Sequence, residues 1–225
     1  MGRLGFRYRA FGAEHIPATG GVLIAANHAS FLDIPLLGCG IPRRVAFLGR
    51  QDLFPLPGLN GVLQWLGWIP IRHDRLDRTG FKRATELIKK GHAVVIYPEG
   101  TRTRTGHLMP GKPGIGTIVA ETGCPVLPAY IAGTYEALPI NSWKLRFHPV
   151  QVTFGMPIDF TNDRQRLARK DLYRHVSRTT MERIAELGAI ALWRFLGARD
   201  QHAHHRHAHT ENGTDELSAI QRRLA

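Results

Sequence analysis

Apolar segments, each as long as a β-strand, recur along the first two thirds of the chain. Four of them are Val22–Ala26, Val45–Leu48, Ala93–Tyr97 and Pro125–Ile131. A strand that is apolar at every position, rather than at every second one, is buried on both faces, as in a parallel sheet covered by helices. Two further segments, Leu145–His148 and Val150–Phe154, predict additional strands at the edge of the same sheet.

Segments with a helical spacing of apolar residues separate the predicted strands. The clearest runs from Thr79 to Lys90, with Thr79 as the N-cap and Gly91 at the C-terminal stop. The other predicted helices are Ile34–Gly40, Gly114–Thr122 and the long Gln165–Gly197. Strands that alternate with helices predict an α/β fold, here a single domain over residues 1–197 with a mostly parallel mixed sheet flanked by helices.

Leu53–Ile71 is a stretch of 19 residues without a charged side chain. It is long enough to cross a membrane, but its three prolines and three glycines argue against an uninterrupted spanning helix. Trp65 and Trp68, with Arg50 and Arg72 on either side, are typical of a segment that lies in the lipid interface. The alternative is that these apolar side chains belong to the core of the domain.

Beyond Gly197 the composition of the chain changes. Residues 198–225 contain four arginines and four acidic residues, so this segment adds nothing to the net charge, and we expect a mostly disordered tail. Five histidines between positions 202 and 209 could bind a divalent metal, but no second ligand group accompanies them, and we assign no metal site. The apolar end of the preceding helix, Ile190–Leu196, is expected to pack on the domain, with insertion into a lipid interface as the alternative.

The chain is basic, with 30 lysines and arginines against 18 aspartates and glutamates, a net charge of +12. Such a surface favours nucleic acids, acidic lipid head groups or phosphorylated substrates, and no basic run with interleaved aromatic residues supports the first of these. Cys39 and Cys124 lie in separate apolar segments, which predicts a reducing compartment. Residues 1–13 lack the apolar core of a signal peptide, so we expect the chain at the cytoplasmic face of the membrane or in the cytosol.

The segment Asn27–Asp33 directly follows the first apolar run and so lies at the strand's C-terminal edge, where open α/β sheets place their active sites. Its His28 and Asp33 form a pair that can take a proton from an alcohol, because imidazole titrates near neutral pH and a carboxylate can hold its other nitrogen. We expect His28 on the loop and Asp33 in the first helical turn. The structural alternative is that Asp33 is an N-cap, with Ser30 completing a capping box ahead of Pro35.

A second group of polar residues follows the run that ends at Tyr97, again at the C-terminal edge of a strand. Gly100 permits a sharp turn or the close approach of a ligand. Arg102 offers a planar fork suited to phosphate oxygens, which Glu99 could orient. Together with the cations Arg72 and Lys112, these residues suggest a phosphate-holding cluster beside a base. The alternative for each cation is an ordinary solvated surface charge.

Four segments of the chain resemble motif blocks of the glycerolipid acyltransferases, the family typified by 1-acyl-sn-glycerol-3-phosphate acyltransferase. Asn27–Asp33 matches the first block, the His-x4-Asp motif, and Gly67–Arg72 looks like the second. Tyr97–Arg104 is very close to the third block, and Cys124–Pro128 is similar to the fourth. The blocks stand in the order that the family shows. One departure is Pro113, which follows Lys112 and alters the local turn.

The resemblance implies a role for each matching residue. His28 would be the general base on the acceptor hydroxyl, with Asp33 orienting and charging it. The donor would be a thioester of coenzyme A or of acyl carrier protein, attacked directly, so no acyl-enzyme serine and no further cofactor or metal is implied. The residues that would position the acceptor and its phosphate are Arg72, Glu99, Gly100, Thr101, Arg102 and, in an assisting role, Lys112.

The resemblance thus predicts a peripheral membrane enzyme with a glycerol-3-phosphate acyltransferase-like α/β fold, which acylates lysophosphatidic acid to phosphatidic acid. The alternatives are another acceptor, such as an amino-lipid, a glycolipid or glycerol 3-phosphate, or a non-catalytic protein that binds anionic lipids. A mere binding site needs no poised base, so the pair of His28 and Asp33 argues for the enzyme. Attachment to the bilayer is expected from Leu53–Ile71, the basic surface or the long C-terminal helix.

Overall fold

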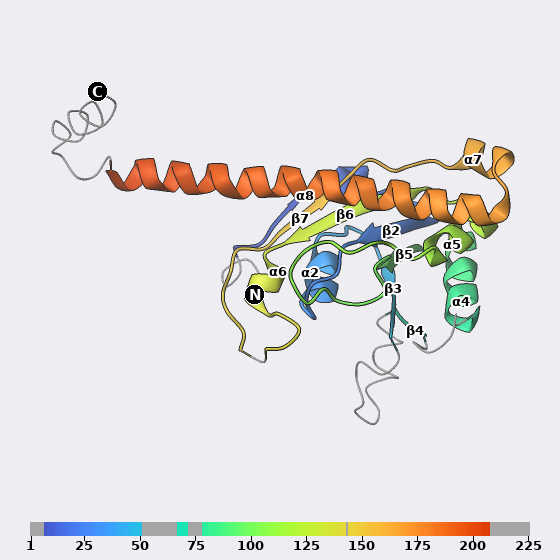
Figure 1. The fold of residues 1–225 in the computed structure, drawn as a ribbon, viewed down its shortest axis with the longest axis horizontal. Helices are drawn as coiled ribbons and strands as arrows, with labels where there is room; N and C mark the ends of the chain where they lie inside the picture. The colour runs from blue at the N-terminus through green and yellow to red at the C-terminus, as the bar shows by residue number, and fades with distance from the viewer. Residues whose placement is uncertain (1–6, 51–66, 72–77, 143, 208–225) are drawn as a thin grey trace. The chain divides into compact units, whose positions relative to one another are not determined.

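The computed structural model describes residues 7–50, 67–71, 78–142 and 144–207 (Figure 1). By its internal contacts the chain divides into two compact units, Met1–Gly188 and Ala189–Ala225. The first unit contains every strand in the described part of the chain and every predicted site residue.

A seven-stranded sheet, in the order β1-β7-β6-β2-β5-β3-β4, forms the centre of the first unit. Neighbouring strands are parallel except for β6 and β7, which are antiparallel. This arrangement confirms the predicted mostly parallel mixed sheet. The strands are β1 (Arg9–Phe11), β2 (Val22–Ala26), β3 (Val45–Arg50), β4 (Trp68–Ile71), β5 (Ala93–Ile96), β6 (Val126–Ala132) and β7 (Gln151–Phe154).

Helices cover both faces of the sheet. They are η1 (Ala13–His15), α2 (Asp33–Cys39), α4 (Arg78–Lys89), α5 (Gly114–Thr122), α6 (Thr134–Ala137), α7 (Thr161–Arg166) and α8 (Arg169–His207). The central strand β2 shows why its sequence is apolar throughout: Leu23 and Ala25 join one buried cluster, and Val22, Ile24 and Ala26 join the other. The first cluster packs beneath α4, α5 and the start of α8, and the second packs against α2 (Figure 1).

Two predictions about the edges of the sheet were wrong. The segment Leu145–His148 is not a strand but part of the loop before β7, and its Leu145 and Phe147 are exposed. Strand β7 is not an edge strand, because the short β1 pairs with its outer side and leaves all of β7 buried.

The outermost strand on the other side of the sheet, β4, belongs to the stretch Leu53–Ile71. Its Ile69 is a core residue, so part of that stretch supports the core alternative. Residues 51–66 lie outside the described residues, and the predicted interfacial placement of their tryptophan stays a prediction.

The predicted helix Gln165–Gly197 is two helices in the structure. The backbone of Leu167 is extended, with φ of −99° and ψ of 142°, and this residue ends α7. Helix α8 then continues to His207, ten residues past Gly197, where the sequence suggested the start of a tail. The predicted disorder of residues 208–225 falls outside the described residues. Among the helices that the structure describes, none is both long enough and apolar enough to cross a membrane.

Candidate active site

The loop after β2 is tied to the neighbouring strand β6 by one buried side chain. The amide nitrogen of Asn27 donates to the carbonyl of Ile131 at 3.0 Å, and the amide oxygen accepts from the N–H of Ile131 at 2.7 Å. These two bonds resemble the backbone pairing of neighbouring strands, and they extend the pairing of β2 with β6 by one residue beyond the end of β2. They fix the position from which His28 leaves the sheet, a role that the sequence analysis did not assign to Asn27.

His28 and Asp33 are in contact, as their spacing predicted. His28 Nδ1 lies 2.7 Å from Asp33 Oδ2, His28 is 8% exposed and Asp33 is fully buried. The same carboxylate oxygen also accepts from the backbone N–H groups of Ala29, at 2.6 Å, and Ser30, at 2.8 Å. The loop therefore wraps around the carboxylate, and three donors of the protein converge on Oδ2.

The alternative interpretation of Asp33 as an N-cap is wrong. Leu32 occupies the N-cap position of α2, and its own side chain makes no capping hydrogen bond. Asp33 is already inside the helix, so its carboxylate accepts from the preceding loop instead of from the first helical turn. Ser30 makes half of the predicted capping box, its N–H donating to Asp33, while its hydroxyl donates to the carbonyl of Leu138 at 2.7 Å.

Tyr97 directly follows β5, and its ring packs against the imidazole of His28. Its ring stacks on that of His28, with centroids 4.0 Å apart and planes 16° from parallel. The Tyr97 hydroxyl is buried and makes no hydrogen bond within the described residues. Burial raises the pKa of this phenol well above its usual range, and the nearby charge of Asp33 raises it further. Sequence reasoning placed Tyr97 in the third motif block without giving it this role.

Glu99 connects the two loops that meet at the sheet edge. Its Oε1 accepts from the backbone N–H of His28 at 2.8 Å, and its Oε2 accepts from that of Met109 at 2.9 Å. A return bond runs from the N–H of Thr103 to the carbonyl of His28 at 2.9 Å. Burial raises the pKa of the Glu99 carboxyl, and the two backbone bonds partly offset that effect. One oxygen of Glu99 thus holds the loop that carries His28, and the other holds the backbone at Met109.

Gly100 and Lys112 are brought together although twelve residues separate them. Gly100 has a φ of +71°, and a Cβ at this position would lie 2.8 Å from Lys112 Nζ. The lysine side chain therefore crosses directly above this glycine, and the positive φ is what favours glycine at this position. The departure at Pro113 is accommodated, because Pro113 is the N-cap of α5 and its ring suits the backbone angles there.

Arg102 reaches back to the first motif block. Its guanidinium carbon lies 3.6 Å from the centre of the Phe31 ring, a cation–π contact. The pair of His28 and Asp33 is therefore accompanied at the ends of β2 and β5 by two of the predicted cations, those of Arg102 and Lys112. Thr101 is half-buried in the same loop. Arg72, the remaining predicted cation, lies outside the described residues.

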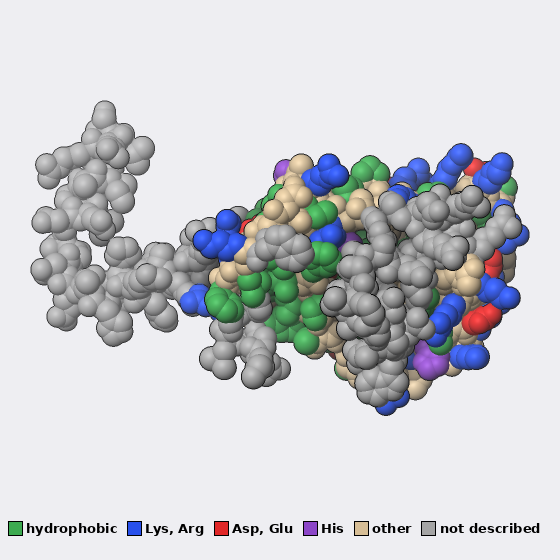
Figure 2. All heavy atoms as spheres, turned by 90° about the horizontal axis from the view of Figure 1, so that it is seen from below, with side chains coloured by type: hydrophobic (Ala, Val, Ile, Leu, Met, Phe, Trp, Pro, Cys, Tyr) green, Lys and Arg blue, Asp and Glu red, His purple; other side chains and the backbone are tan. Residues whose placement is uncertain are grey.

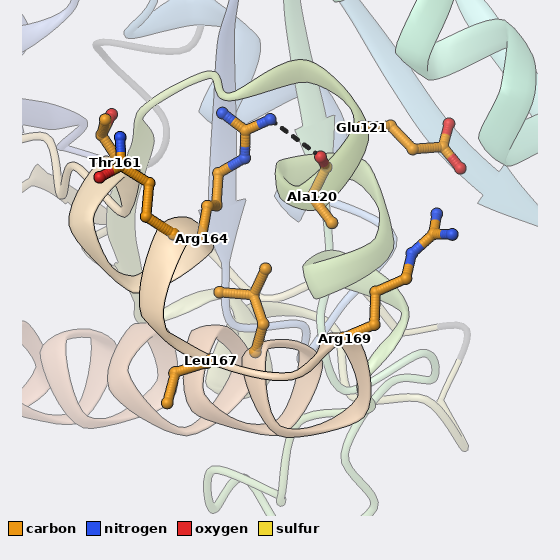
Figure 3. Close-up of a pocket in the computed structure, with 8 residues that line it drawn as sticks. Ala120, Glu121, Thr161, Arg164, Leu167 and Arg169 are labelled. Atoms are coloured by element: carbon orange, nitrogen blue, oxygen red, sulfur yellow. Dashed lines mark hydrogen bonds between the residues drawn. The ribbon is translucent and has the colours of Figure 1, made fainter.

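A separate hollow of about 360 Å³ lies near the end of α5 (Figure 3). There Arg164 donates to the carbonyl of Ala120 at 3.0 Å and so satisfies a backbone group at the helix C-terminus. Because α5 leads into the start of β6, this hollow lies near the N-terminal ends of the parallel strands. His28 lies at the other side of the sheet, where the C-terminal ends of these strands are. None of the predicted site residues lines this hollow, and we assign Arg164 a structural role.

Comparisons with known proteins agree with the motif blocks. The family described as Acyltransferase matches residues 7–132. A chloroplastic 1-acyl-sn-glycerol-3-phosphate acyltransferase of Brassica napus is 36% identical over 65% of this chain and 44% of its own length, and that of Bacillus subtilis is 29% identical over 56% and 62%. The crystal structure of a 1-acyl-sn-glycerophosphate acyltransferase from Thermotoga maritima superposes with a TM-score of 0.65 at 29% identity, covering 81% of this chain and 72% of the other. The chain spans less than half of the length of the plant relative.

Proposed function

The chain belongs to the acyltransferase family, and from that premise we propose that it moves a fatty acyl chain from acyl-CoA or acyl carrier protein to the free hydroxyl of lysophosphatidic acid, giving phosphatidic acid. The observation that carries the proposal is the 2.7 Å contact of His28 Nδ1 with Asp33 at the C-terminal edge of β2. The similar proteins are 1-acyl-sn-glycerol-3-phosphate acyltransferases, and this likeness is the support for the proposed acceptor.

The geometry supports a general-base mechanism. With Asp33 ionised, His28 Nδ1 carries the proton that it shares with the carboxylate, and the lone pair of Nε2 is left for the acceptor hydroxyl. As Nε2 takes the hydroxyl proton, the acceptor oxygen forms a bond to the thioester carbonyl. The carbon–sulfur bond then breaks, and the departing thiolate recovers the proton from the imidazolium. Asp33 stabilises the imidazolium throughout, and such a positioned base contributes roughly 10²–10⁴ in rate.

We also propose that the polar residues around the pair hold the acceptor and its phosphate. Arg102 and Lys112 would supply positive charge from two sides, and the planar fork of Arg102 suits bidentate contact with phosphate oxygens. The engaged oxygens of Glu99 indicate that it acts by holding the loops on which these groups stand. The full proposed set is Arg72, Glu99, Gly100, Thr101, Arg102 and Lys112.

A peripheral position on the cytoplasmic face of the membrane is part of the proposal. Its support is the lipid nature of the acceptor and the net charge of +12, since each lysine or arginine near an anionic bilayer contributes about 1 kcal/mol of attraction. The domain proposed to carry the activity is residues 1–197.

The test of the proposal replaces the base while keeping the fold. We expect His28→Gln to lower kcat for transfer from acyl-CoA to lysophosphatidic acid by about 10²–10⁴, with the fold retained as measured by circular dichroism. The matched control is His92→Gln, because His92 is an exposed histidine after α4. Turnover of His28→Gln within threefold of the unaltered protein would contradict the base assignment.

The acceptor needs a separate experiment. Mass spectrometry of the products from a mixed panel of lysolipids, amino-lipids and glycerol 3-phosphate identifies the molecule that gains the acyl chain. Transfer to a different acceptor overturns lysophosphatidic acid while keeping the acyltransfer. Binding of anionic lipid without turnover of either donor favours the non-catalytic alternative.

A further inference from the structure

The loop between α6 and β7 lies at the same edge of the sheet as the His28–Asp33 pair. In the antiparallel pairing of β6 with β7, Ala132 stands opposite Gln151, so the connection between them leaves and re-enters the sheet where β6 ends. The parallel pairing of β2 with β6 brings the end of β2 to that edge as well, with Ala26 opposite Ala129. The topology therefore places this connection beside the loop that carries His28.

Hydrogen bonds confirm that the two loops touch. The hydroxyl of Ser30, which lies between His28 and Asp33 in sequence, donates to the carbonyl of Leu138 at 2.7 Å. Further along, the N–H of Arg146 donates to the carbonyl of Ala137 at 2.8 Å, which closes the connection back onto α6. The segment around Arg146 is thus anchored near the catalytic loop.

Residues 144–147, here called the edge loop, alternate cationic and large apolar side chains. Leu145 is 47% exposed and Phe147 is 75% exposed, and the intervening Arg146 and preceding Lys144 are also exposed. In Figure 1 the yellow connection before β7 lies on the lower side of the sheet. Figure 2 views the molecule from that side and shows hydrophobic side chains gathered there, with lysine and arginine side chains at the margin.

More positive charge lies at the same edge. Arg9 stands opposite Gln151 in the β1–β7 pairing, and both Arg7 and Arg9 are exposed. Within the described residues 7–12 and 133–150, the exposed lysines and arginines are Arg7, Arg9, Lys144 and Arg146, and the acidic residue is Glu136. Apolar side chains that protrude among cations match a bilayer surface, where anionic head groups surround an accessible acyl region.

We propose that the edge loop docks on an anionic bilayer, with Leu145 and Phe147 in the interface and Lys144 and Arg146 on the head groups. This placement turns the edge that carries His28 toward the lipid, so an acceptor can reach the base without leaving the membrane surface. The choice of a bilayer rests on the proposed function, because that function makes the acceptor a lipid. The docking itself requires no turnover.

The experiment measures sedimentation of the full chain with vesicles of phosphatidylcholine alone or mixed with phosphatidylglycerol. We expect the double variant Leu145→Ser/Phe147→Ser to bind mixed vesicles at least tenfold more weakly. Lys144→Gln and Arg146→Gln should each weaken binding by about fivefold at low salt. The matched control is Met156→Ser: Met156 is 67% exposed but follows the end of β7, at the opposite edge of the sheet.

Two outcomes overturn the proposal: the double variant sediments like the unaltered protein, or Met156→Ser weakens binding equally. Circular dichroism shows whether each variant keeps its fold, and substitution of exposed side chains is expected to leave it unchanged. The same double variant should lose transfer to an acceptor embedded in vesicles and retain transfer to a short-chain acceptor in free solution. If the unaltered protein shows no acyl transfer at all, the proposed function fails, and sedimentation still decides the role of the edge loop.

Discussion

At the scale of single residues, the two oxygens of Asp33 have different surroundings. Oδ2 accepts from His28 and from two backbone N–H groups, whereas Oδ1 accepts no hydrogen bond from the residues that the structure describes. The negative charge of this carboxylate also acts on Tyr97, whose raised pKa keeps the phenol neutral at any physiological pH. Tyr97 therefore presents a neutral ring on which the imidazole of His28 stacks.

A pair of substitutions at Tyr97 separates the contribution of its ring from that of its hydroxyl. Tyr97→Phe keeps the ring under His28 and removes a buried hydroxyl that makes no bond among the described residues. We expect the free energy of unfolding to be unchanged or to rise by about 1 kcal/mol, and kcat to stay the same. Tyr97→Ala leaves a cavity beneath the imidazole, which we expect to cost about 3–5 kcal/mol and to lower kcat. Urea unfolding and steady-state kinetics measure both effects, and loss of activity in Tyr97→Phe would show that the hydroxyl takes part.

The sequence predicts the contact of His28 with Asp33 but not the residues that support this pair, for a physical reason. The spacing of His28 and Asp33 is local, so the motif itself brings them together. The partners of Asn27 and of the His28 backbone lie 104 and 71 residues away, at Ile131 and Glu99. Such contacts depend on which strands become neighbours, and no pattern within one segment reports that.

At the scale of elements, α5 and α8 approach each other closely through a glycine. A Cβ added to Gly116 of α5 would meet the backbone of Tyr173 in α8, with the carbonyl oxygen of Tyr173 at 2.8 Å. Backbone atoms of two helices cannot move aside as a flexible side chain can. The small residue therefore sets the distance at which α8 covers this part of the sheet.

We expect Gly116→Ala to destabilise the fold despite the higher helix propensity of alanine. Overpacking against backbone costs about 1–3 kcal/mol, which exceeds the roughly 0.5–1 kcal/mol that alanine gains within a helix. Gly38→Ala is the matched control, because a Cβ there would meet only the Phe47 ring at 3.4 Å, near ordinary contact. Thermal and urea unfolding of both variants test this, and equal stability of Gly116→Ala and Gly38→Ala would contradict it.

Elements with a strong local pattern were predicted from sequence, and those defined by their partners were not. The predicted strand Val22–Ala26 and helix Gly114–Thr122 have the same bounds in the structure. Strand β1 has three residues, two of them exposed, and it exists because Arg9–Phe11 pairs with β7. Leu145–His148 has strand-like residues but no partner strand in the described sheet, so it stays a loop.

At the scale of the whole molecule, the order of the strands brings the segments of the candidate site together. Because β2 lies between β5 and β6, the three segments that follow these strands meet at one edge, although residues 27, 97 and 133 are far apart in the sequence. The sequence predicts that each segment lies at the end of a strand. The order of the strands is a property of long-range pairing, and the sequence analysis did not predict it.

Burial also makes the stability of the whole fold sensitive to alkaline pH through tyrosines in three places. Burial raises the pKa of Tyr8 to about 12, and it raises those of Tyr97 and Tyr130 as well. A tyrosine in an unfolded chain has a pKa of about 10. Between these values the unfolded state loses protons that the folded state keeps, so stability that is fully present below pH 10 is lost as the pH rises toward 12 and beyond.

We therefore expect the free energy of unfolding to fall steeply above pH 10, and this fall to be smaller in the variant Tyr8→Phe. The Tyr8 hydroxyl donates to the carbonyl of Leu36 at 2.9 Å, so its removal costs about 0.5–1.5 kcal/mol at neutral pH. The informative quantity is consequently the slope with pH rather than the absolute stability. Urea unfolding at several pH values from 8 to about 12 gives both slopes. Because Tyr8 titrates only after unfolding in this range, equal slopes for the two proteins would mean that its pKa is not raised in the folded state.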